Sequence, residues 1–496
     1  MGSTTKPART ALVLGGGISG LLAARELAAA GLSVTVLEAT DTWGGCVGSH
    51  VVAGLTLDSG AESFATRSTA VADLAGELGL ADRIVEPKPG GAWVQLPEGA
   101  RELPRTGVLG IPANPWDPEV RRTLGFTGSL RASLDRFLPA SVGVSGDVTS
   151  VSALVRARMG RRVLDRLVAP VVGGVHSADP ALLDVDMVAP GLRAGITRHG
   201  SLAAAVAAQR RSPAAPQTQA PPSGTPASHN AGQPALAKAG SAVASLVGGM
   251  HTLIAALLAD LRERGVTLQG GSAAEIVART ADGWRVTTAD ATYDGGALVV
   301  ALPGPAAVGL LQAAVPALAG RSPESGPDVR LVTLVVDVPE LDGRPRGTGI
   351  LVAPQAPGIE AKALTHATAK WDWLAAAAGP GTHVLRLSYG RLDGTATTGS
   401  TGAAPTSDAE LLAAALRDAS ALLEVPVQSK DVVDWDVVRW EGALPFAAVG
   451  HKARVAEVRE LCAAQPALAI VGGWVAGNGL AAVVSDTRQQ VRKLLS

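Results

Sequence analysis

The chain has 496 residues, 43 Lys and Arg against 44 Asp and Glu, and an apolar fraction of 47% in which few residues are aromatic. A chain of this length exceeds one ordinary hydrophobic core, so we expect two or three lobes. The balanced charge argues against a nucleic-acid-binding protein, which needs a strongly basic face. The two cysteines, Cys46 and Cys462, stand far apart without a CxxC pair or a histidine cluster, so we predict neither a disulfide framework nor a metal site.

The first ten residues, MGSTTKPART, are polar and lack the apolar core of a signal peptide. No later stretch supplies the roughly 20 uncharged apolar residues that a membrane span needs. We therefore expect a cytoplasmic protein that is at most peripheral at a membrane surface.

The segment TALVLGGGISGLLAARELAAAGLSVTVLEA predicts a strand, a glycine turn, a helix and a second strand. Its GGGISG turn matches the GxGxxG pattern, which places a pyrophosphate at the positive end of a helix, and an acidic residue at the end of the second strand can bind ribose hydroxyls. A purely structural glycine turn is the alternative, and FAD and NAD both fit this unit. The candidate cofactor contacts here are Gly15, Gly17, Ile18, Ser19, Gly20, Glu38 and Ala39.

The adjacent glycines Gly44 and Gly45 follow in DTWGGCVGSH, and such a pair after the acidic strand is typical of flavoproteins. Next, LDSGAESFATRS breaks from a short strand into a turn that carries an acid, a hydroxyl, a phenyl ring and an arginine. It is either an ordinary polar connection or one wall of a site for a flat ligand.

Residues 85–240 contain Pro-rich loops and helices, and the tract 210–240 has almost no bulky apolar side chain, so we predict a disordered insertion there. Short strands follow, with a turn at Asp282-Gly283 and a last strand at 297–302 that should return to the first sheet. Strand-like runs mark residues 327–450, and the C-terminal segment predicts a strand, a glycine turn and a closing helix. The predicted division is a cofactor domain formed by 8–84, 241–326 and 451–496, a substrate domain and helical lobe in 85–209, the insertion 210–240, and a substrate domain in 327–450.

These motifs together resemble the flavin-containing amine oxidase superfamily and, within it, the porphyrinogen oxidases of tetrapyrrole biosynthesis. The similarity includes LVAPVVGGVHSADP, SLVGGMHTLIAAL, KALTHATAKWDWL and the closing AGNGLAA, and runs from residue 11 to the C-terminus outside the insertion. It implies an α/β fold with an FAD-binding Rossmann-like domain, a mixed-sheet substrate domain and a helical lobe. Bacterial members with this composition resemble coproporphyrinogen III oxidases, which implies oxidation of coproporphyrinogen III to coproporphyrin III in haem biosynthesis, with oxygen as acceptor and hydrogen peroxide as product.

The resemblance implies further flavin contacts along the chain. They are Gly60, Ala61, Glu62, Ser63, Ala273, Trp474, Gly477, Asn478, Gly479 and Leu480. Four propionates call for cations at the pocket rim, because a guanidinium binds a carboxylate with two parallel hydrogen bonds. The candidate substrate contacts are Arg67, Arg105 and Arg439, and Arg67 has a surface ion pair as its alternative.

No catalytic residue is assigned, since a flavin carries the redox chemistry itself. His176 and His451 are candidate general bases, although a single histidine more often has a structural role. The alternatives are a protoporphyrinogen IX oxidase, another flavin amine oxidase or desaturase, and a non-catalytic flavin or tetrapyrrole carrier. The oligomeric state and a transient contact with a ferrochelatase-type enzyme or a membrane surface stay open.

Overall fold

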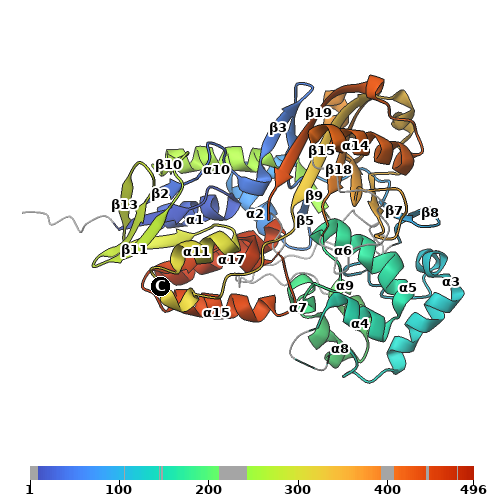
Figure 1. Cartoon of the computed structure of the whole chain (residues 1–496), viewed down its shortest axis with the longest axis horizontal. Coiled ribbons are helices and arrows are strands. Elements are labelled where there is room, and N and C mark those ends of the chain that lie inside the picture. Colours follow the sequence, from blue (N-terminus) through green and yellow to red (C-terminus); the bar gives the residue numbers. More distant parts are fainter. Residues whose placement is uncertain are drawn as a thin grey trace, which may run out of the picture.

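The computed structural model describes residues 9–104, 107–144, 146, 149–211, 243–391, 407–442, 446–477 and 479–496. The predicted α/β architecture is confirmed. Figure 1 shows three regions: a parallel sheet with its helices on the left, a larger sheet at the upper right and a group of helices at the lower right.

The parallel sheet has the strand order β10-β2-β1-β14-β20. Its strands are β10 (Thr267–Gln269), β2 (Ser33–Leu37), β1 (Thr10–Leu14), β14 (Ala297–Val300) and β20 (Leu468–Ile470). The strand expected at 297–302 does return to the first sheet, since Ala11 pairs with Ala297 and Leu14 with Val300. Strand β14, inside the sheet, and the edge strand β20 are both buried along their full length, because helices cover the two faces of the sheet.

Helices cover this sheet on both faces. They include α1 (Ile18–Ala29), α10 (His251–Glu263), α17 (Leu480–Leu495), α15 (His451–Ala463) and α11 (Gly304–Leu311). A small antiparallel sheet packs beside them and consists of β11 (Ile276–Thr280), β12 (Gly283–Thr287) and β13 (Thr292–Gly295). The predicted turn at Asp282-Gly283 lies between β11 and β12, and Gly283 is the first residue of β12.

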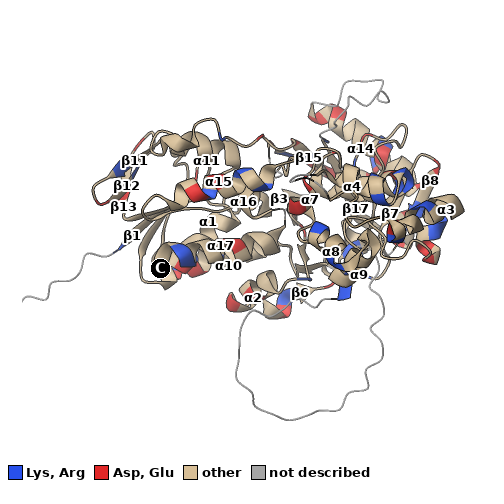
Figure 2. Ribbon diagram, turned by 90° about the horizontal axis from the view of Figure 1, so that it is seen from below, with Lys and Arg blue, Asp and Glu red and all other residues tan. Residues whose placement is uncertain are grey.

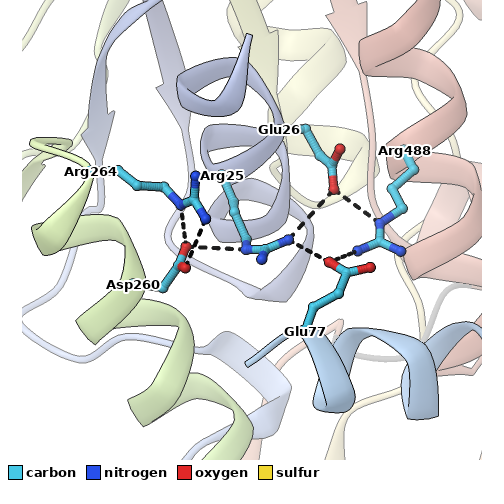
Figure 3. A network of polar contacts seen from close by, with 6 residues as sticks. All are labelled: Arg25, Glu26, Glu77, Asp260, Arg264 and Arg488. Carbon is cyan, nitrogen blue, oxygen red and sulfur yellow. Dashed lines mark hydrogen bonds and ion pairs between the residues drawn. The ribbon is translucent and has the colours of Figure 1, made fainter. Parts of the chain in front are cut away.

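Ion pairs tie together four helices of this region: α1, α2 (Ala70–Glu77), α10 and α17. Arg25 on α1 lies 2.6 Å from Glu77 and 3.1 Å from Asp260, and Arg488 contacts Glu26 at 3.0 Å (Figure 3). This network holds the C-terminal half of α1, the helix that starts at the glycine turn.

The second large sheet has seven strands in the order β19-β15-β18-β17-β16-β7-β8. They are β19 (Val432–Trp440), β15 (Val329–Asp337), β18 (Thr382–Tyr389), β17 (Ala363–His366), β16 (Gly349–Val352), β7 (Trp93–Leu96) and β8 (Gly99–Glu102). The sheet is mixed, because β16 pairs in parallel with β7 while the other pairs are antiparallel. Helix α14 (Asp408–Leu423) packs on one face through a buried leucine and alanine core.

Two small sheets connect the large ones. The hairpin of β3 (Ser49–Val52) and β4 (Leu55–Asp58) packs against the seven-stranded sheet, and β9 (Val243–Leu246) pairs with both β5 (Phe64–Ala65) and β6 (Ile84–Val85). Short helices α12 (Ala367–Lys370) and α13 (Asp372–Ala378) follow β17 on the same side. The segment from β3 to β5 therefore bridges the two large sheets.

The predicted helical lobe is present as one apolar core. Its helices are α3 (Pro118–Ser133), α4 (Val151–Arg158), α5 (Arg161–Val163), α6 (Ala169–His176), α7 (Val185–Val188), α8 (Leu192–His199) and α9 (Leu202–Arg211). Helix α9 takes in the first two residues of the predicted insertion, and 212–240 lies outside the described residues.

One ion pair is fully buried in this lobe. Arg158 Nε donates to Asp135 Oδ1 at 2.5 Å, and its Nη1 donates to the carbonyls of Pro139 and Val142 at 3.1 and 2.9 Å. Both side chains are at most 1% exposed. The pair joins α4 to the turn after α3, and it stabilises the lobe only when both partners are present.

We expect Asp135→Ala to destabilise the helical lobe by about 3–5 kcal/mol, because it leaves the guanidinium of Arg158 buried without its counter-charge. Differential scanning calorimetry would measure this as a lowered melting temperature. The matched control is Asp294→Ala, which removes a carboxylate from an exposed pair with Arg285 and should leave the melting temperature unchanged. Equal melting temperatures for the two variants would contradict the assigned role.

Candidate active site

The glycine turn after β1 has three glycines with different local constraints. Gly15 has a φ of +101°, and a Cβ on Gly20 would lie 1.9 Å from the carbonyl oxygen of Gly15, so no side chain fits at Gly20. A Cβ on Gly17 would meet nothing within 4 Å. Packing within the chain therefore requires Gly20, whereas the space in front of Gly17 is open to a ligand.

The N-terminus of α1 opens onto that space. Gly17 is its N-cap and supplies no side-chain cap, and Ile18 and Ser19 form the first turn. Gly44 N donates to Gly16 O at 2.8 Å, and a Cβ on Gly45 would lie 3.3 Å from Gly17 Cα. The GGGISG turn and the pair Gly44-Gly45 thus lie side by side. Backbone N–H groups and the helix dipole favour an anionic group there.

Glu38 lies at the end of β2 beside the same turn. Its Oε2 accepts a hydrogen bond from Gly16 N at 2.6 Å, and its Oε1 accepts one from Thr40 N at 3.0 Å. Its carbonyl oxygen accepts from Ser272 N at 2.7 Å, which brings the segment with Ala273 to this edge of the sheet. Ala39 and Ala273 are exposed there.

The LDSGAESFATRS segment forms a wall between the two large sheets. Ala61 N donates to Cys46 O at 2.8 Å, and a Cβ on Gly60 would lie 2.2 Å from the same oxygen. Ser245 Oγ donates to the carbonyl oxygen of Glu62 at 2.8 Å. The backbone from Gly60 to Ser63 is therefore fixed by close contacts on both sides.

Glu62 is the centre of a charge cluster whose side chains are largely buried, with 13–16% of each exposed. Its carboxylate pairs with Lys370, the last residue of α12, and lies 3.2 Å from Arg386 on β18. Arg386 also donates to the carbonyl oxygen of Gly60 at 2.8 Å. Burial raises the pKa of Glu62, but the charges of Lys370 and Arg386 outweigh it and bring the pKa down to about 2. The carboxylate is therefore ionised at every physiological pH.

Asp58 fixes the other end of the wall. It accepts hydrogen bonds from Met250 N at 2.9 Å and from His251 N at 3.0 Å, so it caps the N-terminus of α10. Trp440 on β19 reaches across and donates from Nε1 to Ser59 O at 2.9 Å. The loop that begins at Asp58 is thus bonded both to α10, which packs on the parallel sheet, and to β19, the edge strand of the seven-stranded sheet.

The two candidate histidines lie in one pocket. His176, His451, Gly473, Trp474 and Gly477 line it, together with Met187, Val188 and Ala447. His451 Nε2 lies 2.7 Å from Trp474 O, and because a carbonyl only accepts, this nitrogen carries the proton. Burial lowers the pKa of His176 to about 4 and also lowers the pKa of His451, so both imidazoles are uncharged near neutral pH.

The closing turn is formed as predicted between β20 and α17. Helix α16 (Gly473–Ala476) leads to Gly477, which has a φ of +96°, and Gly479 with a φ of +110° is the N-cap of α17 before Leu480. Among the described residues, no hydrogen-bond partner is found for the buried Nε1 of Trp474. Asn478 lies outside the described residues.

The candidate substrate arginines do not come together in the part of the chain that the structure describes. Arg67 is exposed after β5, and Arg105 lies outside the described residues. Arg439 on β19 pairs with Asp408 at the start of α14, whereas its neighbour Trp440 points to Ser59. Because side chains alternate along a strand, Arg439 lies on the α14 face of the sheet.

Sequence reasoning did not identify the two positively charged residues that pair with Glu62. Neither Lys370, which lies in the motif KALTHATAKWDWL, nor Arg386 is among the candidate site residues named from the sequence. Arg386 does leave a signal, since it is a charged residue between apolar neighbours in the stretch VLRL of β18. Its partner could not be found in the sequence, because Glu62 is 324 positions away (386 − 62).

Comparison with known proteins agrees with this geometry. Residues 18–487 match the model of the family "Flavin containing amine oxidoreductase", and the chain belongs to this family. The chain is 31% identical to the coproporphyrinogen III oxidase of Mycobacterium leprae over 98% of both chains. It is 31% identical to the mitochondrial protoporphyrinogen oxidase of Nicotiana tabacum over 52% of this chain and 48% of that protein. The crystal structure of a candidate protoporphyrinogen oxidase from Exiguobacterium sp. 255-15 superposes with a TM-score of 0.77 at 23% identity, covering 98% of this chain and 99% of that one.

We expect Glu62→Gln to destabilise the protein by on the order of 3 kcal/mol at neutral pH, because it leaves Lys370 and Arg386 buried without their counter-charge. The folded pKa of about 2 lies below the unfolded value of 4.5, so the contribution of Glu62 is fully present above about pH 4.5 and is lost as the pH falls toward 2. Melting temperatures of the wild type and the variant should differ by a constant amount from about pH 5 to 8 and converge in acid. Two results would contradict this assignment. One is a melting-temperature difference between the wild type and Glu62→Gln that stays constant down to pH 3. The other is a melting temperature of Glu62→Gln equal to that of the wild type, as expected only for the exposed control Glu263→Gln.

Proposed function

We propose that the protein is an FAD-dependent oxidase that converts coproporphyrinogen III into coproporphyrin III, with molecular oxygen as acceptor and hydrogen peroxide as product. The observation that carries the proposal is the similarity to a coproporphyrinogen III oxidase along 98% of both chains, which takes in the helical lobe and the seven-stranded sheet as well as the glycine turn. The glycine turn alone would fit many flavoproteins, whereas the other two regions are where a substrate would be selected.

The residues around the glycine turn fit FAD. The open space before Gly17, the uncapped start of α1 and the glycines Gly44 and Gly45 suit a pyrophosphate, and Glu38 stands where ribose hydroxyls would bind. The wall from Gly60 to Ser63 and the closing turn at Gly477 and Gly479 would hold the ring system. When bound, FAD supplies a two-electron acceptor that oxygen reoxidises, and porphyrinogen oxidation needs three such cycles.

The protein residues supply position and proton acceptors. The cluster around Glu62 holds the wall rigidly against β18, so the backbone of Gly60 and Ala61 keeps one geometry. His176 and His451 lie in one pocket and are uncharged near neutral pH, so each has an unprotonated ring nitrogen for a proton that a methylene bridge or pyrrole nitrogen loses, although burial makes both imidazoles weak bases. Arg67 and Arg105 are the proposed partners of the propionates.

Other flavin amine oxidases fit less well. An aromatic cage beside the flavin needs rings that are free to face a substrate amine, and the chain has two tyrosines. Tyr389 is buried and donates to Asp418 at 3.2 Å, and Tyr293 lies in the small sheet on β13. A protoporphyrinogen IX oxidase is the nearer alternative, and a flavin or tetrapyrrole carrier without turnover is the third.

The test supplies coproporphyrinogen III and protoporphyrinogen IX separately to the purified holoprotein and follows porphyrin fluorescence and hydrogen peroxide with and without oxygen. We expect oxygen-dependent turnover with a higher kcat/KM for coproporphyrinogen III. A preference for protoporphyrinogen IX would replace the substrate assignment, and no turnover of either compound would favour the carrier.

The cofactor assignment predicts that Gly17→Val folds normally but loses its flavin. The Cβ of the new side chain would meet no protein atom within 4 Å, and the side chain would fill the space where the pyrophosphate would approach the backbone. We expect flavin occupancy, measured by absorbance after denaturation, to fall by at least tenfold with little change in the circular dichroism spectrum. The control is Gly76→Val on α2, where an added Cβ also meets nothing within 4 Å, and this variant should keep its FAD. Full flavin occupancy in Gly17→Val would contradict the proposed pyrophosphate site.

A further inference from the structure

Lys362 carries a buried amine at the boundary between the helical lobe and the seven-stranded sheet. Basic residues usually lie on the outside of a protein, and Figure 2 shows many of them on outer helices such as α3. Lys362 stands directly before β17 and is only 3% exposed. Its Nζ donates to Ser177 Oγ and, at 3.0 Å, to the carbonyl oxygen of Gly390 after β18. No carboxylate pairs with this amine in the part of the chain that the structure describes.

The contact joins the motif KALTHATAKWDWL, which begins at Lys362, to the motif LVAPVVGGVHSADP, which contains Ser177. Helix α6 ends at His176, and Ser177 is its C-cap with a φ of +53°, a left-handed conformation that residues other than glycine seldom adopt. Ser177 is 1% exposed, and its N donates to Gly173 O at 3.1 Å. Like every other helix in the described part of the chain, α6 lacks the length and apolar character of a membrane span.

The two sides of this contact are held in different ways. On the sheet side, Lys362 N donates to Ser388 O at 2.8 Å, so strand pairing fixes the backbone of the lysine. Helix α6 is held by close packing instead, since a Cβ on Gly174 would lie 2.6 Å from Leu351 Cδ2 on β16. The turn at Ser177 is therefore the side that can shift without breaking a strand pair.

The surroundings of Lys362 disfavour its positive charge. Burial and, to a smaller extent, the nearby guanidinium of Arg391 lower the pKa of Lys362 to about 7. His176 on α6 is uncharged near neutral pH. On the α14 side, Asp418 accepts hydrogen bonds from the backbone of residues 360–361, and Glu360 pairs with an arginine of α14. The end of α6 favours a cation, but the amine still changes its charge near neutral pH.

The two protonation states of Lys362 need different surroundings. An uncharged amine has two N–H groups, and Ser177 Oγ and Gly390 O accept both. A charged ammonium has a third N–H, for which the described chain offers no acceptor. A buried donor without an acceptor is costly, so protonation favours a shift of the Ser177 turn that admits water.

We propose that Lys362 is a positioning residue for His176: its uncharged amine holds the end of α6 against the sheet, and its protonation releases that turn. His176 directly precedes Ser177 and lines the pocket that also contains His451 and Trp474. Release of the turn changes where the His176 ring stands in this pocket. The effect on turnover rests on the proposed oxidase activity, whereas the effect on the position of His176 does not.

The first test follows the histidine rings by NMR in holoprotein labelled with nitrogen-15 in its histidines, with the signal of His176 assigned from the spectrum of His176→Gln. We expect this signal to shift in a step near pH 7, although the pKa of His176 is about 4, because it reports the charge of Lys362. The step should vanish in Lys362→Met, whose side chain is unbranched and cannot titrate. The control Lys430→Met, at an exposed position before β19, should keep it.

A second variant tests the same link without removing the buried amine. Ser177→Gly deletes the hydroxyl that accepts from Lys362, while glycine adopts the left-handed conformation without strain. We expect the step of the His176 signal near pH 7 to shrink at least threefold in this variant. Each variant is first compared with the wild type by circular dichroism and melting temperature.

The third measurement is the pH profile of kcat and KM for coproporphyrinogen III between about pH 5.5 and 9. We expect the kcat of the wild type to fall about tenfold below pH 7 with little change in KM, because a misplaced proton acceptor slows the chemical step more than it weakens binding. Lys362→Met should show a lowered kcat without a step near pH 7. Lys430→Met should reproduce the wild-type profile.

Three results would overturn the inference. They are a His176 signal without a step near pH 7 in the wild type, a step that both Lys362→Met and Ser177→Gly retain in full, and an active wild type whose kcat has no step near pH 7. A purely structural lysine would give the second result together with lowered melting temperatures. A step that Lys362→Met removes, in a protein that does not turn over coproporphyrinogen III, would refute the proposed activity and support the positioning role.

Discussion

The buried carboxylate of Glu62 is the contact on which the arrangement of the site depends. It lies in the loop between β4 and β5, and its partners Lys370 and Arg386 belong to the seven-stranded sheet side of the molecule. Taking three charges out of water is costly, so the cluster is favourable only when its members are in contact. This requirement holds the wall close to the seven-stranded sheet, and the same loop has a second attachment to that sheet through Trp440 and Ser59.

The glycines of the first turn show how a motif can combine folding and binding. Gly20 is required by the protein itself, since a side chain there would strike the backbone of Gly15. Gly17 has no such constraint, and its lack of a side chain is useful only if something outside the chain approaches it. The sequence pattern treats the two positions alike. The structure separates them, and this separation is what makes the flavin assignment testable without damage to the fold.

Local patterns predicted the fold well, because strands, glycine turns and amphipathic helices depend on neighbouring residues. The βαβ unit, the returning strand β14 and the closing turn before α17 were all expected and are present. The long-range contacts were not predicted, because the charge and spacing of residues in the sequence do not reveal which residues meet in the fold. Asp58 caps a helix 192 positions further on, and Arg386 could be noticed as unusual in its strand but not paired with Glu62. Arg439 shows a related difficulty, since strand alternation separates it from Trp440 but does not say which face meets α14. The binding roles of all the candidate site residues, Arg105 and Asn478 among them, stay predictions.

The most direct measurement is an anaerobic titration of the purified holoprotein with coproporphyrinogen III, with the absorbance of the oxidised flavin and the fluorescence of the porphyrin recorded together. The account predicts that the flavin is bleached while porphyrin forms, with one substrate molecule able to reduce three flavins, and that admitting oxygen restores the flavin colour and releases hydrogen peroxide. A flavin that stays oxidised in the presence of bound coproporphyrinogen III would contradict the proposed oxidase and leave a protein that binds without turnover.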